Sequence, residues 1–261
     1  MPRPADPDAP MFHPRGLVRR VHGHPSALAG GIRALLIQAL HPLAMAAVAD
    51  HTDPREEAWR RIERTRDYVR VVTFGTRAQA LAAARHVNSI HRRVTGVDQV
   101  TGHPYRADDP ELLLWVHSVL VDSELVAYQR FGPGLSRRAE DRYVSEMIVA
   151  AALVGIPAVS VPRTAAANRR YLAQVPGLRV TAAARDGVRM LLRPPHRPLA
   201  FPIWGVGLAA AVSLLPDEVR RAYGIHWSPV ADAAVDLAMV GLTWAALHVL
   251  PEPRLPNVRV A

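Results

Sequence analysis

Twelve histidines and no cysteine provide the candidate metal ligands of this 261-residue chain. The absence of cysteine excludes disulfides, iron–sulfur clusters and thiol nucleophiles, so a metal must be held by imidazole, carboxylate or a cofactor ring. The sequence contains neither His-Glu-x-x-His nor Glu-x-x-His, the helical spacings of zinc and di-iron sites, and no Gly-x-Ser-x-Gly nucleophile elbow. Each histidine must therefore be judged by the helical face on which it lies.

His91 is the histidine that helical periodicity places most clearly in the core. On a helix expected over residues 76–95, His91 shares a face with Ala84. His86 lies on the opposite, polar face, near Arg93. A buried ring without a partner would cost about 1–3 kcal/mol. We therefore expect His91 either to be hydrogen-bonded inside the core or to act as a ligand.

The preceding helix, expected over residues 54–74, places Arg61 and Thr65 one turn apart beside the apolar Ile62. In one interpretation the stem of Arg61 packs on the protein surface, and the hydroxyl of Thr65 bonds back to a helix carbonyl. In the other, the guanidinium and the hydroxyl hold an anion or an oxygen species beside the pocket of His91. The sequence leaves both interpretations open.

Two further histidines lie in apolar surroundings. His117 faces the core on a helix expected over residues 109–130, and Glu124 lies about 10 Å further along that face, too far for a direct pair. A structural role and a role in a site are equally open for His117. His41 precedes a proline that should break the first long helix and free the carbonyl group of Gln38. We expect the ring of His41 to bond that carbonyl rather than a metal.

The expected fold class is all-α, because apolar residues recur every three or four positions and no run is typical of a strand. Residues 16–250 are expected to form a single multi-helix domain. The proline-rich residues 1–15 are expected to be a disordered or draped tail, and residues 251–261 an extended tail. Helices are expected over residues 27–49 with a break after His41, 54–74, 76–95, 109–130, 136–154, 164–174, 181–192, 203–214, 216–223 and 229–249.

Charge and hydropathy restrict the partners. The formal net charge is +9, but the 32 basic residues are all arginines and are scattered along the chain, so we expect no nucleic-acid partner. Two apolar runs over residues 199–250 are interrupted, the first by Pro202 and the second by Asp232 and Asp236. Buried helices are predicted there, with peripheral membrane contact as the alternative. Because residues 1–15 lack the apolar segment of a signal peptide, we expect a cytoplasmic or membrane-associated protein.

A series of motifs resembles, in the same order, the MpaB and latex-clearing-protein (rubber oxygenase) family, the DUF2236 domain. The resemblance covers residues 16–175, and the motifs are specific when taken together. They are Leu35 to Pro42, Ala49 to His51, Arg61 to Thr65, Phe74 to Gly75, His91 to Gly96, Gly102 to Ala107, Asp109 to His117, and Val161 to Thr164.

The resemblance implies a globin-like helical core that binds haem b, with one histidine as the axial iron ligand. That histidine corresponds to His91. The family's arginine and threonine beside the haem correspond to Arg61 and Thr65, and the basic residue before the threonine corresponds to Arg64. The resemblance therefore makes Arg61, Arg64 and Thr65 candidate catalytic residues, and Arg61 and Thr65 candidate haem contacts. The acidic residue proposed as a base in rubber-cleaving members has no counterpart that can be placed in this sequence.

The expected function is accordingly that of a haem b-dependent oxygenase, an oxidoreductase that acts with O₂ on a hydrophobic, isoprenoid or lipid-like substrate. One alternative is a non-catalytic haem carrier or sensor, which would keep His91 but show no oxygen-dependent turnover. Another is a helical domain that has lost the cofactor, in which His91 is a core residue. A non-haem site of histidines and carboxylates is disfavoured by the spacings. The sequence leaves the identity of the substrate and the oligomeric state open.

Overall fold

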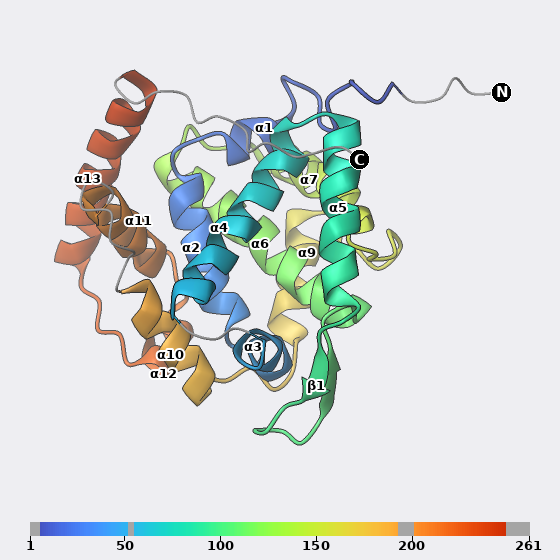
Figure 1. The fold of residues 1–261 in the computed structure, drawn as a ribbon. Helices are drawn as coiled ribbons and strands as arrows, with labels where there is room; N and C mark the ends of the chain where they lie inside the picture. The colour runs from blue at the N-terminus through green and yellow to red at the C-terminus, as the bar shows by residue number, and fades with distance from the viewer. Residues whose placement is uncertain (1–5, 52–54, 193–200, 249–261) are drawn as a thin grey trace.

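Helices dominate the part of the chain that the computed structural model describes, residues 6–51, 55–192 and 201–248. The predicted all-α fold class is confirmed. In chain order (Figure 1), the helices and strands are α1 (Leu17–His22), α2 (Ala27–Gln38), α3 (Pro42–Ala49), α4 (Arg55–Phe74), α5 (Arg77–His91), β1 (Thr95–Val97), β2 (Pro104–Arg106), α6 (Pro110–Phe131), α7 (Arg137–Glu146), α8 (Ile148–Leu153), α9 (Ala165–Gln174), α10 (Ala182–Leu191), α11 (Phe201–Ser213), α12 (Asp217–Tyr223) and α13 (Pro229–His248).

The helix boundaries differ from the predicted ones in a few places. α1 was not predicted, because six residues are too few to show a period. The helix predicted over residues 136–154 is divided into α7 and α8 at Met147, and the helix predicted over residues 76–95 ends at His91. The extended tail predicted over residues 251–261 lies outside the described residues.

Two central helices, α2 and α6, form the middle of the molecule (Figure 1). The remaining helices surround this pair, with α11 against α2, α13 against α11, and α9 against α6. α4 and α5 pack on one another, and α1 contacts α4, α6 and α7. α6 has apolar residues around most of its circumference, so nearly all of it is buried.

The predicted break in the first long helix is confirmed. α2 and α3 meet at 101°, and Pro42 is the first residue of α3. The ring of His41, however, does not bond the carbonyl oxygen of Gln38, and its Nδ1 is buried without a partner. The indole Nε1–H of Trp115 donates to that oxygen instead, at 3.3 Å. The role predicted for the His41 ring is therefore wrong, because a side chain from α6 occupies the acceptor.

A short antiparallel hairpin follows α5, so the prediction of an all-helical chain without strands is wrong at this place. β1 and β2 pair over three residues each, with Gly96 opposite Tyr105. A Cβ atom at Gly96 would lie 2.4 Å from the hydroxyl oxygen of Tyr105, so glycine is required. That hydroxyl donates to Asp50 at the end of α3, at 2.6 Å. Strands of three residues are too short for a period of two to be visible in the sequence.

The N-terminal segment is draped over the protein, and the disorder predicted for residues 1–15 does not apply to residues 6–15. Phe12 is buried in the core that α1, α4, α6 and α7 share. The backbone N–H of Arg77 donates to the carbonyl oxygen of Ala9 at 2.8 Å. A buried aromatic ring and backbone hydrogen bonds fix this segment despite its prolines.

Candidate functional site

The candidate site residues lie on two neighbouring helices, α4 and α5, which pack on one another. At the start of α5, Thr76 and Gln79 form a capping box, in which each side chain accepts a hydrogen bond from the other residue's backbone N–H. A Cβ atom at Gly75 would lie 2.5 Å from the carbonyl oxygen of Val71, so this tight turn needs glycine. The two helices run in opposite chain directions from this turn and diverge with distance from it (Figure 1).

His91 is the last residue of α5, and its side chain is half-buried, whereas His86 is exposed. These exposures agree with the predicted faces. Nδ1 of His91 is buried and has no hydrogen-bond partner among the described residues. Burial lowers the pKa of His91, the positive charge of Arg61 lowers it further, and Asp108 opposes both effects. The imidazole is therefore neutral at pH 7, the form that a metal ligand requires.

The hairpin β1–β2 fixes the backbone that follows His91. The N–H of Val94 donates to the carbonyl oxygen of His91 at 3.1 Å, and the N–H of Ala107 donates to that of Val94 at 2.9 Å. The next residue, Asp108, accepts two hydrogen bonds from Arg106, at 3.0 and 2.9 Å. The motif residues on both sides of the hairpin thus hold the end of α5 in place and fix the carboxylate of Asp108, whose charge acts on His91.

Arg61 lies on α4 within electrostatic reach of His91, because its positive charge contributes to the lowered pKa of that histidine. Its side chain is half-buried; burial lowers the pKa of the guanidinium, and the charge of Arg64 lowers it further. Arg64 and Thr65 are exposed. The Thr65 hydroxyl donates to the carbonyl oxygen of Arg61 at 2.9 Å, the back-bond of the structural interpretation. The structure therefore brings Arg61 toward His91, while the Thr65 hydroxyl is engaged by its own helix.

The interior contains further buried polar groups, among which the sequence singled out only His117. Nε2 of His22, at the end of α1, lies 2.9 Å from the hydroxyl oxygen of Tyr143, while its Nδ1 is buried without a partner. Burial, together with the charge of His117, lowers the pKa of His22 to about 4. Burial also lowers the pKa of His117 to about 4 and raises the pKa of Tyr68 to about 12. All three side chains are therefore neutral at pH 7.

α6 adds a buried carboxyl group to this interior. Glu124 is buried, its Oε2 has no hydrogen-bond partner, and burial raises its pKa well above the usual value, which favours the protonated carboxyl group. Two turns away lies His117, which agrees with the predicted shared face. Among the described residues, eight buried side-chain atoms have no hydrogen-bond partner. They belong to His22, His41, Tyr68, Arg77, His91, Ser118, Glu124 and Thr243.

The chain was compared with models of known protein families. Residues 19–244 match the family described as "ER-bound oxygenase mpaB/B'/Rubber oxygenase, catalytic domain". The chain belongs to the mpaB/rubber oxygenase family. It is thus an oxidoreductase of the oxygenase type. The match reaches into α13, so the family domain extends beyond residues 16–175, where the motifs lie.

A solved structure supports the same fold for this mpaB/rubber oxygenase domain. The structure of latex clearing protein LCP in the closed state aligns with a TM-score of 0.61, at 17% sequence identity, over 92% of this chain and 68% of that chain. None of the curated proteins compared with the chain matches it. Across the residues that the structure describes, no group of three or more histidine or acidic side chains could hold a metal ion.

Proposed function

We propose that the protein is a haem b-dependent oxygenase that uses O₂ on a hydrophobic, isoprenoid or lipid-like substrate. The observation that carries the proposal is the neutral ring of His91, with a buried and unpartnered nitrogen, beside the guanidinium of Arg61. Haem needs a single imidazole from this cysteine-free chain, whereas a bare metal ion needs several ligands. When bound, haem b would supply the oxidation chemistry.

The residues of the chain have separable tasks in this proposal. His91 would hold the haem iron through its neutral ring, whose Nδ1 has no protein partner. Arg61 would hold an anionic haem propionate or orient an oxygen species, and its charge adds to the effect of burial, which lowers the pKa of His91. Thr65 would help to position Arg61 rather than contact the haem, because its hydroxyl group donates its proton to the carbonyl oxygen of Arg61. The exposed Arg64 would add positive charge at the same turn of α4.

Substrate binding would rely on the apolar side chains of α4, α6 and α11. α6 and α11 carry mainly apolar side chains toward the core, and Trp59 of α4 contacts Trp204 of α11 edge to face, with ring centroids 5.1 Å apart. Such walls exclude water and suit a hydrocarbon chain rather than a charged substrate. The apolar surroundings would orient the substrate while O₂ reacts.

The test is to express the protein with a haem precursor and to measure its absorption spectrum and pyridine haemochrome. We expect a Soret band, full haem content in His86→Ala, and loss of haem in His91→Ala. His86→Ala is the matched control, because both histidines lie on α5 and only His91 is half-buried. A colourless protein, or equal haem content in the two variants, would refute the proposal.

A second candidate, a haem carrier or sensor without catalysis, is favoured by one observation. The exposed Thr65 is back-bonded to α4, so its hydroxyl has no proton left to donate to an oxygen species. Oxygen consumption by the haem-loaded protein with an isoprenoid substrate separates the two candidates. Turnover above the rate of free haem supports the oxygenase, and stable haem without turnover supports the carrier.

A further inference from the structure

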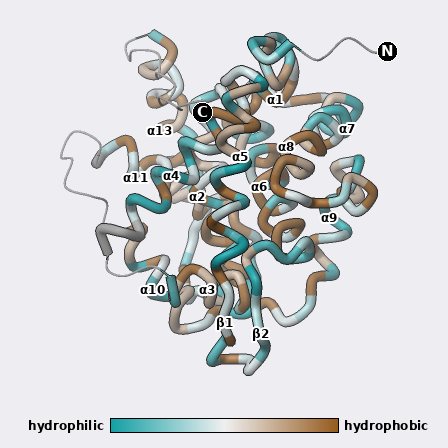
Figure 2. The backbone as a smooth tube through the Cα atoms, turned by 45° about the vertical axis from the view of Figure 1, so that its right-hand side comes forward, coloured by the Kyte–Doolittle hydropathy of each residue, from teal (hydrophilic) through white to brown (hydrophobic). Residues whose placement is uncertain are grey.

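α13 lies at the rim of the molecule (Figures 1 and 2), and one of its faces is apolar and exposed. Among the described residues it is the one unbroken helix long and apolar enough to cross a membrane. Its inner face packs Val235 and Met239 into the core beneath α11. On the outer face, five large apolar side chains are between 60% and 79% exposed: Val230, Leu237, Val240, Trp244 and Leu247.

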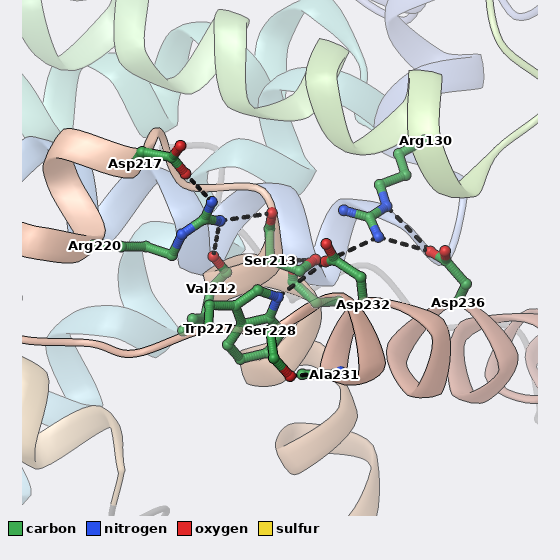
Figure 3. A network of polar contacts seen from close by, with 11 residues as sticks. Arg130, Val212, Ser213, Asp217, Arg220, Trp227, Ser228, Ala231, Asp232 and Asp236 are labelled. Carbon is green, nitrogen blue, oxygen red and sulfur yellow. Dashed lines mark hydrogen bonds and ion pairs between the residues drawn. The ribbon is translucent and has the colours of Figure 1, made fainter.

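A polar network fixes which side of α13 faces outward (Figure 3). Arg130, near the end of α6, lies 3.1 Å from both Asp232 and Asp236, one turn apart on α13. The indole of Trp227 also donates to Asp232, at 2.9 Å. These contacts hold the first two turns of α13 against the body of the protein. The apolar side chains therefore point outward because the rotation of the helix is fixed.

The exposed positions follow the spacing of a helix-pairing seam. Together with the exposed Ala233, the apolar residues alternate steps of three and four along α13, the a and d positions of a heptad repeat. A face that lies on anionic lipid usually has basic residues beside it, whereas the charged residues of α13 near this seam are Asp232 and Asp236. A second helix therefore fits this face better than a bilayer.

The seam is complementary to itself when two copies run antiparallel. A two-fold axis beside the middle of α13 places Leu237 opposite Val240 of the second copy. The same axis places Val230 opposite the second copy's Leu247. It also places Trp244, the largest side chain of the seam, opposite the second copy's Ala233, the smallest. Each layer thus combines an a position with a d position, as antiparallel pairs require, and the closed two-fold symmetry prevents further growth.

We propose that the protein forms a two-fold symmetric dimer through antiparallel pairing of α13. The five large apolar side chains expose about 600 Å² together, close to the ~800 Å² that each partner buries in a standard interface. The formal charge of +9 on each copy opposes association, but it is screened over about 8 Å at physiological ionic strength. The proposal is independent of haem and substrate.

The test uses the absence of cysteine from the natural sequence. Chains carrying Val230→Cys are mixed with chains carrying Leu247→Cys under mild oxidation. We expect disulfide-linked dimers in the mixture and few in either variant alone, because antiparallel pairing joins position 230 to position 247. Links within each variant alone would indicate parallel pairing, and an absence of links in all three samples would overturn the proposal.

Two further variants separate pairing from misfolding. Leu237→Asp should raise the dimer dissociation constant at least about tenfold in sedimentation equilibrium, because it places two carboxylates near the symmetry axis. Val159→Asp is the matched control, since Val159 is 89% exposed and lies away from α13. The exchange of Ala233→Trp with Trp244→Ala should restore pairing that Ala233→Trp alone weakens. A monomer at all concentrations, with or without binding to lipid vesicles, would overturn the dimer.

Discussion

Replacement of Gly30 by alanine is expected to destabilise the contact between the two central helices. Gly30 lies on α2 against Glu124 of α6. A Cβ atom there would lie 2.8 Å from Oε2, 2.9 Å from Cδ and 3.0 Å from Cα of Glu124. The carboxyl group is buried and has little room to move, and the Cα atom is part of the α6 backbone. The helices must therefore separate slightly to accept one methyl group.

The expected size of the effect follows from two opposing contributions. Overpacking a tight core costs about 1–3 kcal/mol, and these contacts belong at the upper end of that range. Replacing glycine by alanine inside a helix raises the free energy of unfolding by about 1 kcal/mol. Gly30→Ala should therefore lower the free energy of unfolding by about 1–2 kcal/mol. At Gly31 the nearest atom would be Oε1 of Glu124 at 3.9 Å, so Gly31→Ala should stabilise by up to about 1 kcal/mol.

Thermal unfolding of the two variants and the natural protein measures this difference. For a domain of this size, 1 kcal/mol corresponds to about 2–4 °C in Tm, so the expected difference of about 1–3 kcal/mol between Gly30→Ala and Gly31→Ala corresponds to roughly 2–12 °C. The two positions are adjacent on one helix, and each gains the same methyl group. Equal Tm values, or a stabilised Gly30→Ala, would show that α2 and α6 are not packed as described.

Two further predictions concern titration. The pKa values of His22 and His117 are about 4 in the folded protein and 6.5 in the unfolded chain, so stability falls as the pH drops below 6.5, by about 2 kcal/mol per histidine at pH 5. Urea unfolding should show a smaller loss in His117→Gln and an unchanged loss in the exposed control His86→Gln. Arg61→Gln should raise the pKa of His91 in an NMR titration, whereas Arg85→Gln, an exposed position on α5, should leave it unchanged. An unaltered His91 titration in Arg61→Gln would contradict the proximity of the two groups.

The sequence predicts features that depend on local periodicity. The burial difference between His91 and His86 follows from the period of a single helix, and the break at Pro42 follows from the missing N–H of one residue. Both are local properties, which explains why they could be predicted without knowledge of the neighbouring helices. The motif order pointed to Arg61 for the same reason, because the motif lies within α4.

Features that depend on distant partners could not be predicted. The environment of His22 is set by Tyr143, which is 121 residues away. The acceptor expected for His41 is bonded by Trp115 from α6, 77 residues beyond Gln38. The hairpin after α5 depends on the contact of Tyr105 with Asp50, and its strands are too short to show a pattern. In each case the contact joins residues that are far apart in the sequence, so it can be recognised only in the folded chain.

The central place of α2 has a consequence for synthesis on the ribosome. Arg33 of this early helix donates to the carbonyl oxygen of Leu214, 181 residues later, and forms a buried ion pair with Asp122. At about 5–20 residues per second, the ribosome needs on the order of ten seconds or more to make the segment that completes this environment. Until then the apolar side chains of α2 are not yet packed against α11. The nascent chain is therefore expected to depend on a chaperone that shields its N-terminal helices, and slower translation before α11 should increase aggregation.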